Sequence, residues 1–138
     1  MHVHPTDEQL ATIADYAATQ TDREVVMLNL LRFADQANPG FGCDGMTGQE
    51  AYEEYGRRIA AMDPPFPGRP IWLGSVGPIV IGPADEAWDQ VILVRYDDAR
   101  QFLDAVSDPA YLRAAPARDA AIADSRLVLM HELLHDKS

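Results

Sequence analysis

The chain has 138 residues, of which 47% are hydrophobic, and it carries a formal net charge of −11 at pH 7. This length and apolar content fit one domain with a hydrophobic core and exclude an intrinsically disordered chain. The excess of carboxylates excludes proteins that hold nucleic-acid phosphates or anionic membrane surfaces through clustered basic residues.

The sequence predicts a cytoplasmic location. Cys43 is the single cysteine, so no intramolecular disulfide can form, which favours a reducing compartment. No apolar run approaches the ~20 residues of a membrane span. The first eight residues lack the basic and apolar regions of a secretory signal.

Residues 1–24 are expected to form a helical extension. Thr6 and Gln9 have the spacing of a capping box, in which two side chains satisfy free N–H groups at the start of a helix. Apolar residues then recur at helical spacing, which predicts a helix over residues 7–19.

The next stretch, residues 25–33, is predicted to be a strand buried on both faces. Apart from Asn29, residues 25–31 are apolar at both parities, so one polar amide lies in the middle of a buried run. A loop rich in turn formers, residues 34–46, follows it. Thr47 and Glu50 then form a second capping box and begin a second helix.

The second half of the chain supplies two helical segments and three strands. Strands are predicted over residues 70–77, 88–96 and 125–130, with a short continuation of the first at 79–81. Asp97 or Asp98 can cap one helix. Asp108 and Pro109 fit the cap and first position of another.

This order, β-α-β-β-α-β after the first helix, predicts an α+β, ferredoxin-like domain over residues 25–132, followed by a tail at 133–138. Helices would cover one face of an antiparallel sheet. The other face would alternate with polar residues if it met water, yet residues 25–31 and 91–94 are largely apolar at both parities. We therefore expect a second copy to cover that face in a two-fold homodimer.

Several segments, in their order and spacing, resemble the domain-of-unknown-function 1330 family. They are Val-Val-Met-Leu-Asn-Leu-Leu-Arg-Phe (25–33), Glu-Ala-Tyr-Glu-Glu-Tyr-Gly (50–56), Trp-Leu-Gly (72–74), Trp-Asp-Gln-Val (88–91), Arg-Tyr (95–96), Asp-Pro-Ala-Tyr (108–111) and Arg-Asp-Ala-Ala-Ile-Ala-Asp-Ser-Arg-Leu (118–127). The resemblance implies a ferredoxin-like member of the dimeric α/β-barrel superfamily. That superfamily includes cofactor-free monooxygenases, isomerases and dehydratases. Ala117 stands where many relatives carry a histidine, so no role is carried over from that histidine.

Residues 131–135, His-Glu-Leu-Leu-His, match the zinc-protease pattern H-E-x-x-H. Zinc binding would need a helix that places His131 and His135 one turn apart, with Glu132 activating water. Three residues follow His135, which leaves no downstream third ligand. An exposed tail is therefore the preferred interpretation, and a zinc-dependent hydrolase is the alternative.

Residues 40–45, Gly-Phe-Gly-Cys-Asp-Gly, match G-x-G-x-x-G. The dinucleotide fingerprint needs its first glycine directly at the end of a strand, whereas six residues intervene here. A flexible loop without a cofactor is expected, and Cys43 within it is expected to be an incidental thiol. Asp85, Glu86 and Asp89 are interpreted as solvated charges.

A small set of residues combines polar tips with apolar surroundings, which is the composition of a ligand pocket. The candidates are Asn29, Arg32, Tyr55, Trp72, Trp88, Arg95, Tyr111 and Arg118. Asn29 would orient a carbonyl or hydroxyl, Tyr55 would donate a proton, Arg32 or Arg118 would hold an anion, and the tryptophans would wall the pocket.

We expect a dimer with one pocket per subunit between sheet and helices, acting on a small organic molecule without metal or nucleotide. A dimer that binds or senses a ligand without catalysis is the alternative on the same pocket.

Overall fold

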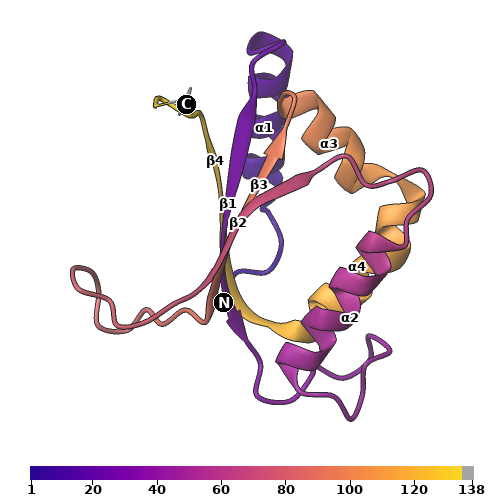
Figure 1. The fold of residues 1–138 in the computed structure, drawn as a ribbon, viewed down its shortest axis with the longest axis vertical. Coiled ribbons are helices and arrows are strands. Elements are labelled where there is room, and N and C mark those ends of the chain that lie inside the picture. The colour runs from indigo at the N-terminus through magenta and orange to yellow at the C-terminus, as the bar shows by residue number, and fades with distance from the viewer. Residues whose placement is uncertain (135–138) are drawn as a thin grey trace.

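The computed structural model describes residues 1–134 and consists of one antiparallel sheet with helices on one of its faces (Figure 1). The strands are β1 (Val25–Phe33), β2 (Arg69–Ser75), β3 (Gln90–Tyr96) and β4 (Ile122–Met130), in the order β2-β3-β1-β4. The helices are α1 (Asp7–Thr19), α2 (Gly48–Ala60), α3 (Ala99–Ser107) and α4 (Pro109–Ala121). The α+β arrangement expected from the sequence is confirmed.

Local capping chemistry sets the starts of the helices. Both expected capping boxes form, at Thr6 for α1 and at Thr47 for α2. The side chain of Asp98 caps α3, and Asp108 caps α4, which begins at Pro109.

The expected strand at residues 79–81 was wrong. Those residues belong to a long connection between β2 and β3, residues 76–89, which we call the arm. Ile79, Val80 and Ile81 have strand-forming side chains, but no neighbouring strand offers them backbone partners there.

Register divides the sheet side chains between two faces. Val25, Met27 and Leu31 of β1 point toward the helices, where they join the hydrophobic core. The alternate residues form what we call the open face. Its members are Val26, Leu28, Leu30 and Arg32 of β1, Arg69, Trp72 and Gly74 of β2, Val91, Leu93 and Arg95 of β3, and Asp124, Arg126, Val128 and Met130 of β4.

Two clusters make up the core between sheet and helices. One surrounds Leu31 and brings Ala51 of α2 against alanines of α4. The other surrounds Val25 and Met27 and includes residues of α1 and α3. Small side chains let these helices approach closely, and at Gly48 the backbone N–H of α2 donates to the carbonyl of Ala34 at 3.0 Å.

The loop at 34–46 is fixed to the core. The Asn38 amide donates to the carbonyls of Asp119 and Ile122, at 2.9 and 3.0 Å, across the α4–β4 junction. Cys43 is 1% exposed and belongs to the Leu31 cluster, so the loop that was expected to be flexible carries a core residue.

The N-terminal residues also pack on the domain. Arg118 donates to the carbonyl of Val3, and the Ser125 hydroxyl donates to that of His2. Within residues 1–134, no helix has both the length and the apolar character needed to cross a bilayer.

Candidate functional site

A continuous chain of aromatic rings lies between the sheet and the helices. Successive ring centroids are 5.3–6.2 Å apart. We call this chain the aromatic layer; its members, in order of contact, are Phe33, Tyr52, Tyr55, Tyr111, Phe66, Tyr96 and Phe102. It joins β1, α2, α4, β3 and α3, so its hydroxyls are the main polar groups in an otherwise apolar space.

Tyr55 of α2 and Tyr111 of α4 share a hydrogen bond between their hydroxyls at 2.9 Å. Such a pair uses one of its two protons, and the second proton stays available to a ligand. Tyr52 and Tyr55 follow each other at i,i+3 on α2, which places both rings on one helix face.

Burial keeps these hydroxyls protonated. It raises the pKa of Tyr52 to about 12, and it raises the pKa of Tyr55 and of Tyr96 further. The positive charge of Arg118 acts in the opposite direction on the pKa values of Tyr52 and Tyr55. At neutral pH Tyr52, Tyr55 and Tyr96 are therefore hydrogen-bond donors.

Asn29 occupies the middle of β1 on the helix-covered face. Its amide nitrogen donates to the carbonyls of Met27 and Ile92, both at 3.3 Å. If the amide were flipped, the Asn29 side-chain oxygen would face two carbonyl oxygens and be repelled by them. The orientation of the amide is therefore fixed. Among the described residues none donates to its amide oxygen. Ile92, its cross-strand partner, packs against the cluster that Tyr52 and Tyr55 also contact.

The helices do not cover the helix-side face out to its edges. Leu127 of β4 pairs with Asn29, and Leu73 of β2 pairs with Ile92, so both leucines point to the helix side. They are nevertheless 46% and 61% exposed. Solvent therefore reaches the sheet on either side of the central strands, next to Asn29.

The structure divides the eight candidate residues between the two faces of the sheet. Asn29 lies on the helix side of the sheet, which is also the side of Tyr55 and Tyr111 on α2 and α4 and of Arg118 on α4. The other four do not lie there. Arg32, Trp72 and Arg95 are on the open face, and Trp88 is in the arm. The expected pocket walled by both tryptophans is therefore not the space that contains Asn29.

Trp72 lies along the open face over Gly74. A Cβ at Gly74 would come within 2.3 Å of the Trp72 ring, so the glycine makes room for the indole. The ring remains 55% exposed, as a large apolar surface on this face.

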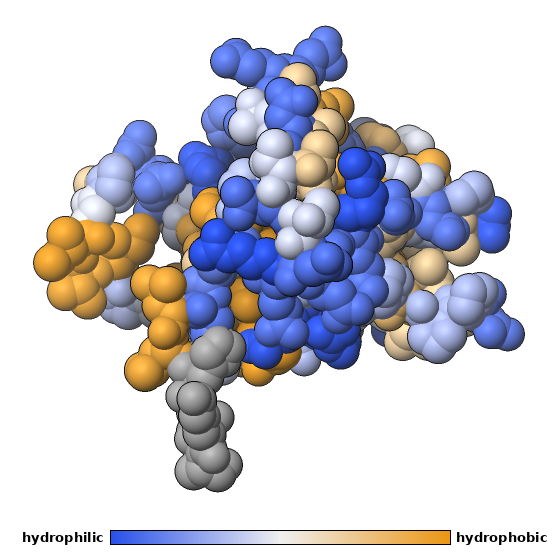
Figure 2. All heavy atoms as spheres, turned by 90° about the horizontal axis from the view of Figure 1, so that it is seen from above, coloured by the Kyte–Doolittle hydropathy of each residue, from blue (hydrophilic) through white to orange (hydrophobic). Residues whose placement is uncertain are grey.

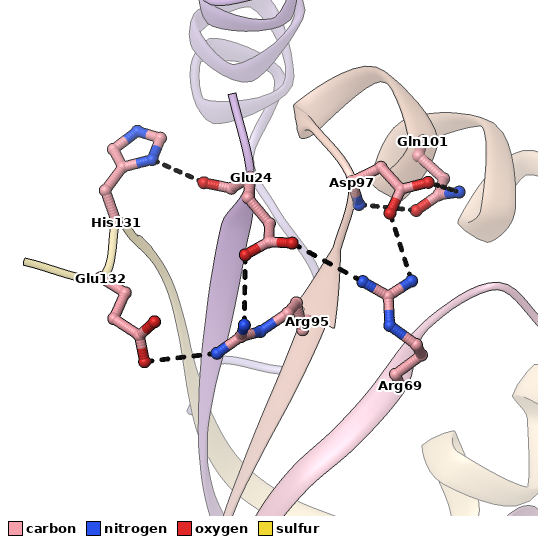
Figure 3. Close-up of polar contacts among 7 residues, drawn as sticks. All are labelled: Glu24, Arg69, Arg95, Asp97, Gln101, His131 and Glu132. Atoms are coloured by element: carbon pink, nitrogen blue, oxygen red, sulfur yellow. Dashed lines mark hydrogen bonds and ion pairs between the residues drawn. The ribbon is translucent and has the colours of Figure 1, made fainter. Parts of the chain in front are cut away.

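Arginines and carboxylates form a network at one end of the open face (Figure 3). Arg95 bonds Glu24 at 3.2 Å and Glu132 at 3.3 Å, and Arg69 bonds Asp97 at 3.2 Å. In Figure 3 the carboxylate of Glu24 lies between the two guanidinium groups. Both arginines are thus paired with carboxylates, and we interpret the network as structural, because it links the ends of neighbouring strands.

A second ionic cluster lies at the other end of the open face. The Arg126 guanidinium stands 4.9 Å from the centroid of the Trp88 ring. It also bonds Asp124 at 2.9 Å and Glu86 at 3.2 Å. Glu86 thus has a protein partner, and Asp89 accepts from the Phe33 backbone N–H at 2.8 Å.

His131 is engaged by the protein through both ring nitrogens. Nδ1 contacts the Glu24 carbonyl at 2.9 Å, and Nε2 contacts the Tyr16 hydroxyl. Residues 131–134 have no helix, and Glu132 bonds Arg95. His135 lies outside the described residues. The helical arrangement that zinc binding would need is therefore not formed over 131–134, and no group of metal-binding side chains occurs in the described part of the chain.

The glycines of residues 40–45 serve the loop itself. Gly40, Gly42 and Gly45 adopt φ values of 89°, 85° and 90°, which side chains other than glycine rarely adopt. The conformation of the loop and the packing of Cys43 in the core therefore explain why glycines occur at these three positions.

Comparison with solved structures identifies a strong relative. The Rhodopseudomonas palustris protein RPA0582, a protein of unknown function, is 34% identical with a TM-score of 0.84, covering 97% of this chain and 98% of that one. A structure of methylated RPA0582 gives the same identity and TM-score over 99% of this chain and 98% of that one.

A more distant structure shares the ferredoxin-like fold. It is a dimeric protein of unknown function from Bacteroides fragilis, 13% identical with a TM-score of 0.52, covering 79% of this chain and 96% of that one. No family model and no curated protein matches the chain.

Proposed function

The chain belongs to the same family as the Rhodopseudomonas palustris protein RPA0582, and from this premise we propose that it is a homodimeric protein that binds a small organic molecule beside the aromatic layer. We place it in the domain-of-unknown-function 1330 family and the dimeric α/β-barrel superfamily, in the cytoplasm. The sequence resemblance supports the family and superfamily, and the single cysteine supports the cytoplasm.

The hydroxyl pair of Tyr55 and Tyr111, on the same side of the sheet as the Asn29 amide, is the observation that carries the proposal. The pair offers one free proton, and Asn29 offers an oxygen that accepts from none of residues 1–134. A ligand would therefore carry an acceptor and a donor on one small apolar frame, as a carboxylic acid, a primary amide or a hydroxy ketone does. The charge of Arg118 favours an anionic acceptor.

The hydroxyls of the aromatic layer suit ligand binding better than they suit catalysis by proton abstraction. The pKa values of Tyr52, Tyr55 and Tyr96 are all raised, so these groups hold their protons and act as donors. A cofactor-free enzyme remains the second candidate, because the same hydroxyl pair would polarise a ligand carbonyl.

The open face supports the homodimer. Leu28, Leu30, Val91 and Leu93 line its centre, and Trp72 and Val128 flank them at 55% and 47% exposure. A contiguous apolar surface of this kind is the usual mark of a protein interface. The relative from Bacteroides fragilis is described as dimeric, which is consistent with pairing here.

Ligand-observed NMR with benzamide, benzoate and toluene tests the site. We expect benzamide and benzoate to bind more tightly than toluene, which lacks polar groups. Tyr55→Phe should weaken benzamide binding about fivefold, since one hydrogen bond contributes roughly 1 kcal/mol. Tyr16→Phe removes a hydroxyl outside the layer and is the matched control. Equal binding of toluene and benzamide, or equal losses in both variants, would contradict the proposed site.

Asn29→Leu separates a binding role from a structural one. The variant should lose benzamide binding and keep both its fold and its dimer, because the Asn29 amide donates to two carbonyls only at the 3.3 Å distances expected of weak bonds. Circular dichroism and light scattering provide the check. A variant that unfolds would show that Asn29 is structural.

A further inference from the structure

The tip of the arm exposes three β-branched residues in a row. Ile79, Val80 and Ile81 are 40%, 92% and 94% exposed, and each end of the run is bounded by a Gly-Pro pair, at 77–78 and 82–83. Single exposed apolar residues are common on soluble proteins, but a contiguous exposed run indicates an interaction surface.

The base of the arm is fixed to the open-face side of the sheet. Arg126 belongs to the open face, and it contacts both Trp88 and Glu86 of the returning limb. At the root, the Asp89 backbone N–H donates to the Leu31 carbonyl at 2.7 Å. In Figure 1 the arm extends away from the helices, on the uncovered side of the sheet. Figure 2 shows orange, apolar atoms gathered on that same side of the molecule.

The two limbs of the arm are joined at the root, where the Val76 backbone N–H donates to the Asp89 carbonyl at 3.0 Å. They enclose an open cavity of about 410 Å³, lined by residues that include Pro78, Ile79, Pro83 and Trp88. The arm therefore offers a projecting apolar tip and, beside it, an open recess of mixed polar and apolar lining.

We propose that the arm clasps a second copy of this chain: in the dimer proposed above, on which this inference rests, Ile79, Val80 and Ile81 of each subunit pack against the partner subunit. A two-fold axis lets each subunit both give and receive an arm. The arm and the apolar centre of the open face then form one interface.

Charge favours a second copy as the occupant. The chain as a whole carries −11, so two copies repel unless the meeting surfaces are balanced. The open face holds Arg32, Arg69, Arg95 and Arg126, which is a large share of the 11 basic residues. Three of these arginines pair with carboxylates. A nucleic acid or an anionic membrane would meet the acidic remainder of the surface.

Sedimentation velocity from nanomolar to high micromolar concentration tests the clasp. The double variant Val80→Ser, Ile81→Ser should raise the dimer dissociation constant about tenfold or more, because two apolar contacts are lost. Leu112→Ser removes an exposed apolar side chain from α4, on the helix side, and should leave the constant unchanged. Both variants lie on the surface, and circular dichroism confirms that each is folded.

The outcomes separate this inference from the proposed dimer. A dimer whose dissociation constant is the same in the arm variant and in the unmodified protein overturns the clasp and leaves the dimer standing. An unmodified protein that stays monomeric overturns both.

Cross-linking identifies what the tip touches. A photo-reactive amino acid at position 80, in a mixture of heavy-isotope and light-isotope protein, should give cross-links between heavy and light chains. Cross-links confined to one chain would show that the tip folds back on its own subunit, which contradicts the inference.

Discussion

Gly48 and Gly56 lie in the same helix and differ in what a side chain would meet. A Cβ on Gly48 would stand 2.1 Å from the Ala34 oxygen and 2.8 Å from the Ala121 oxygen, both backbone atoms, whereas Gly56 faces open space. Gly48→Ala should lower the free energy of unfolding by about 3 kcal/mol, and Gly56→Ala should raise it by about 0.5–1 kcal/mol. Urea titration at one fixed protein concentration measures both. Similar effects in the two variants would contradict the close approach at Gly48.

At this scale the sequence identifies which residues are unusual better than where they meet. Asn29 stands out in an apolar run, and it does lie on the helix-covered face of the sheet, on the side of Tyr55 and Tyr111. Arg32 is three residues away, and odd spacing in a strand places it on the opposite face. Strand parity could have separated those two. The position of Trp88 could not be predicted, because the arm has no periodic pattern.

Other residues of the layer were missed. Tyr52 was not among the candidates, although it precedes Tyr55 by three positions and shares a face of α2 with it. Phe66 comes from the loop after α2 and contacts Tyr96 and Tyr111 through tertiary packing alone. Nothing local in the sequence signals that contact.

At the scale of elements, α2 depends on its capping box. The Thr47 hydroxyl accepts from the Glu50 backbone N–H at 3.1 Å, and the Glu50 carboxylate accepts from the Thr47 N–H at 2.9 Å. The Thr47 backbone and side chain both lower the pKa of Glu50. Thr47→Ala should therefore destabilise the protein by about 1 kcal/mol. Thr12→Ala, which removes an exposed hydroxyl inside α1, is the control and should be near neutral. Thermal unfolding that does not distinguish the variants would contradict this role.

Elements with local signals were predicted closely. The bounds of α1 and β1 match those expected, because a capping box and an uninterrupted apolar run define them. β4 begins three residues earlier than expected, at Ile122, directly after α4 ends. The strand expected at 79–81 failed because β-propensity needs a pairing strand to be realised.

At the scale of the whole molecule, the aromatic layer makes the free energy of unfolding depend on pH in the alkaline range. Folding raises the pKa of Tyr52 from about 10 to about 12, and it raises those of Tyr55 and Tyr96 as well. The folded state therefore favours the protonated form. The contribution of these tyrosines to the free energy of unfolding is complete below about pH 10. It is lost as the pH rises from about 10 through about 12 and beyond.

Absorbance of tyrosinate at alkaline pH provides the measurement. Ionisation of Tyr52, Tyr55 and Tyr96 should coincide with unfolding of the protein. Reversible ionisation of Tyr52, Tyr55 and Tyr96 near pH 10, with the fold intact, would show that the layer is open to water.

The central claim is a homodimer with one ligand site in each subunit. Native mass spectrometry of freshly purified protein tests it most directly, because a single spectrum reports the number of chains and any bound molecule. We predict a species with twice the mass of the chain, accompanied by small-molecule adducts that Asn29→Leu removes. A spectrum of bare single chains at micromolar concentration would contradict the account.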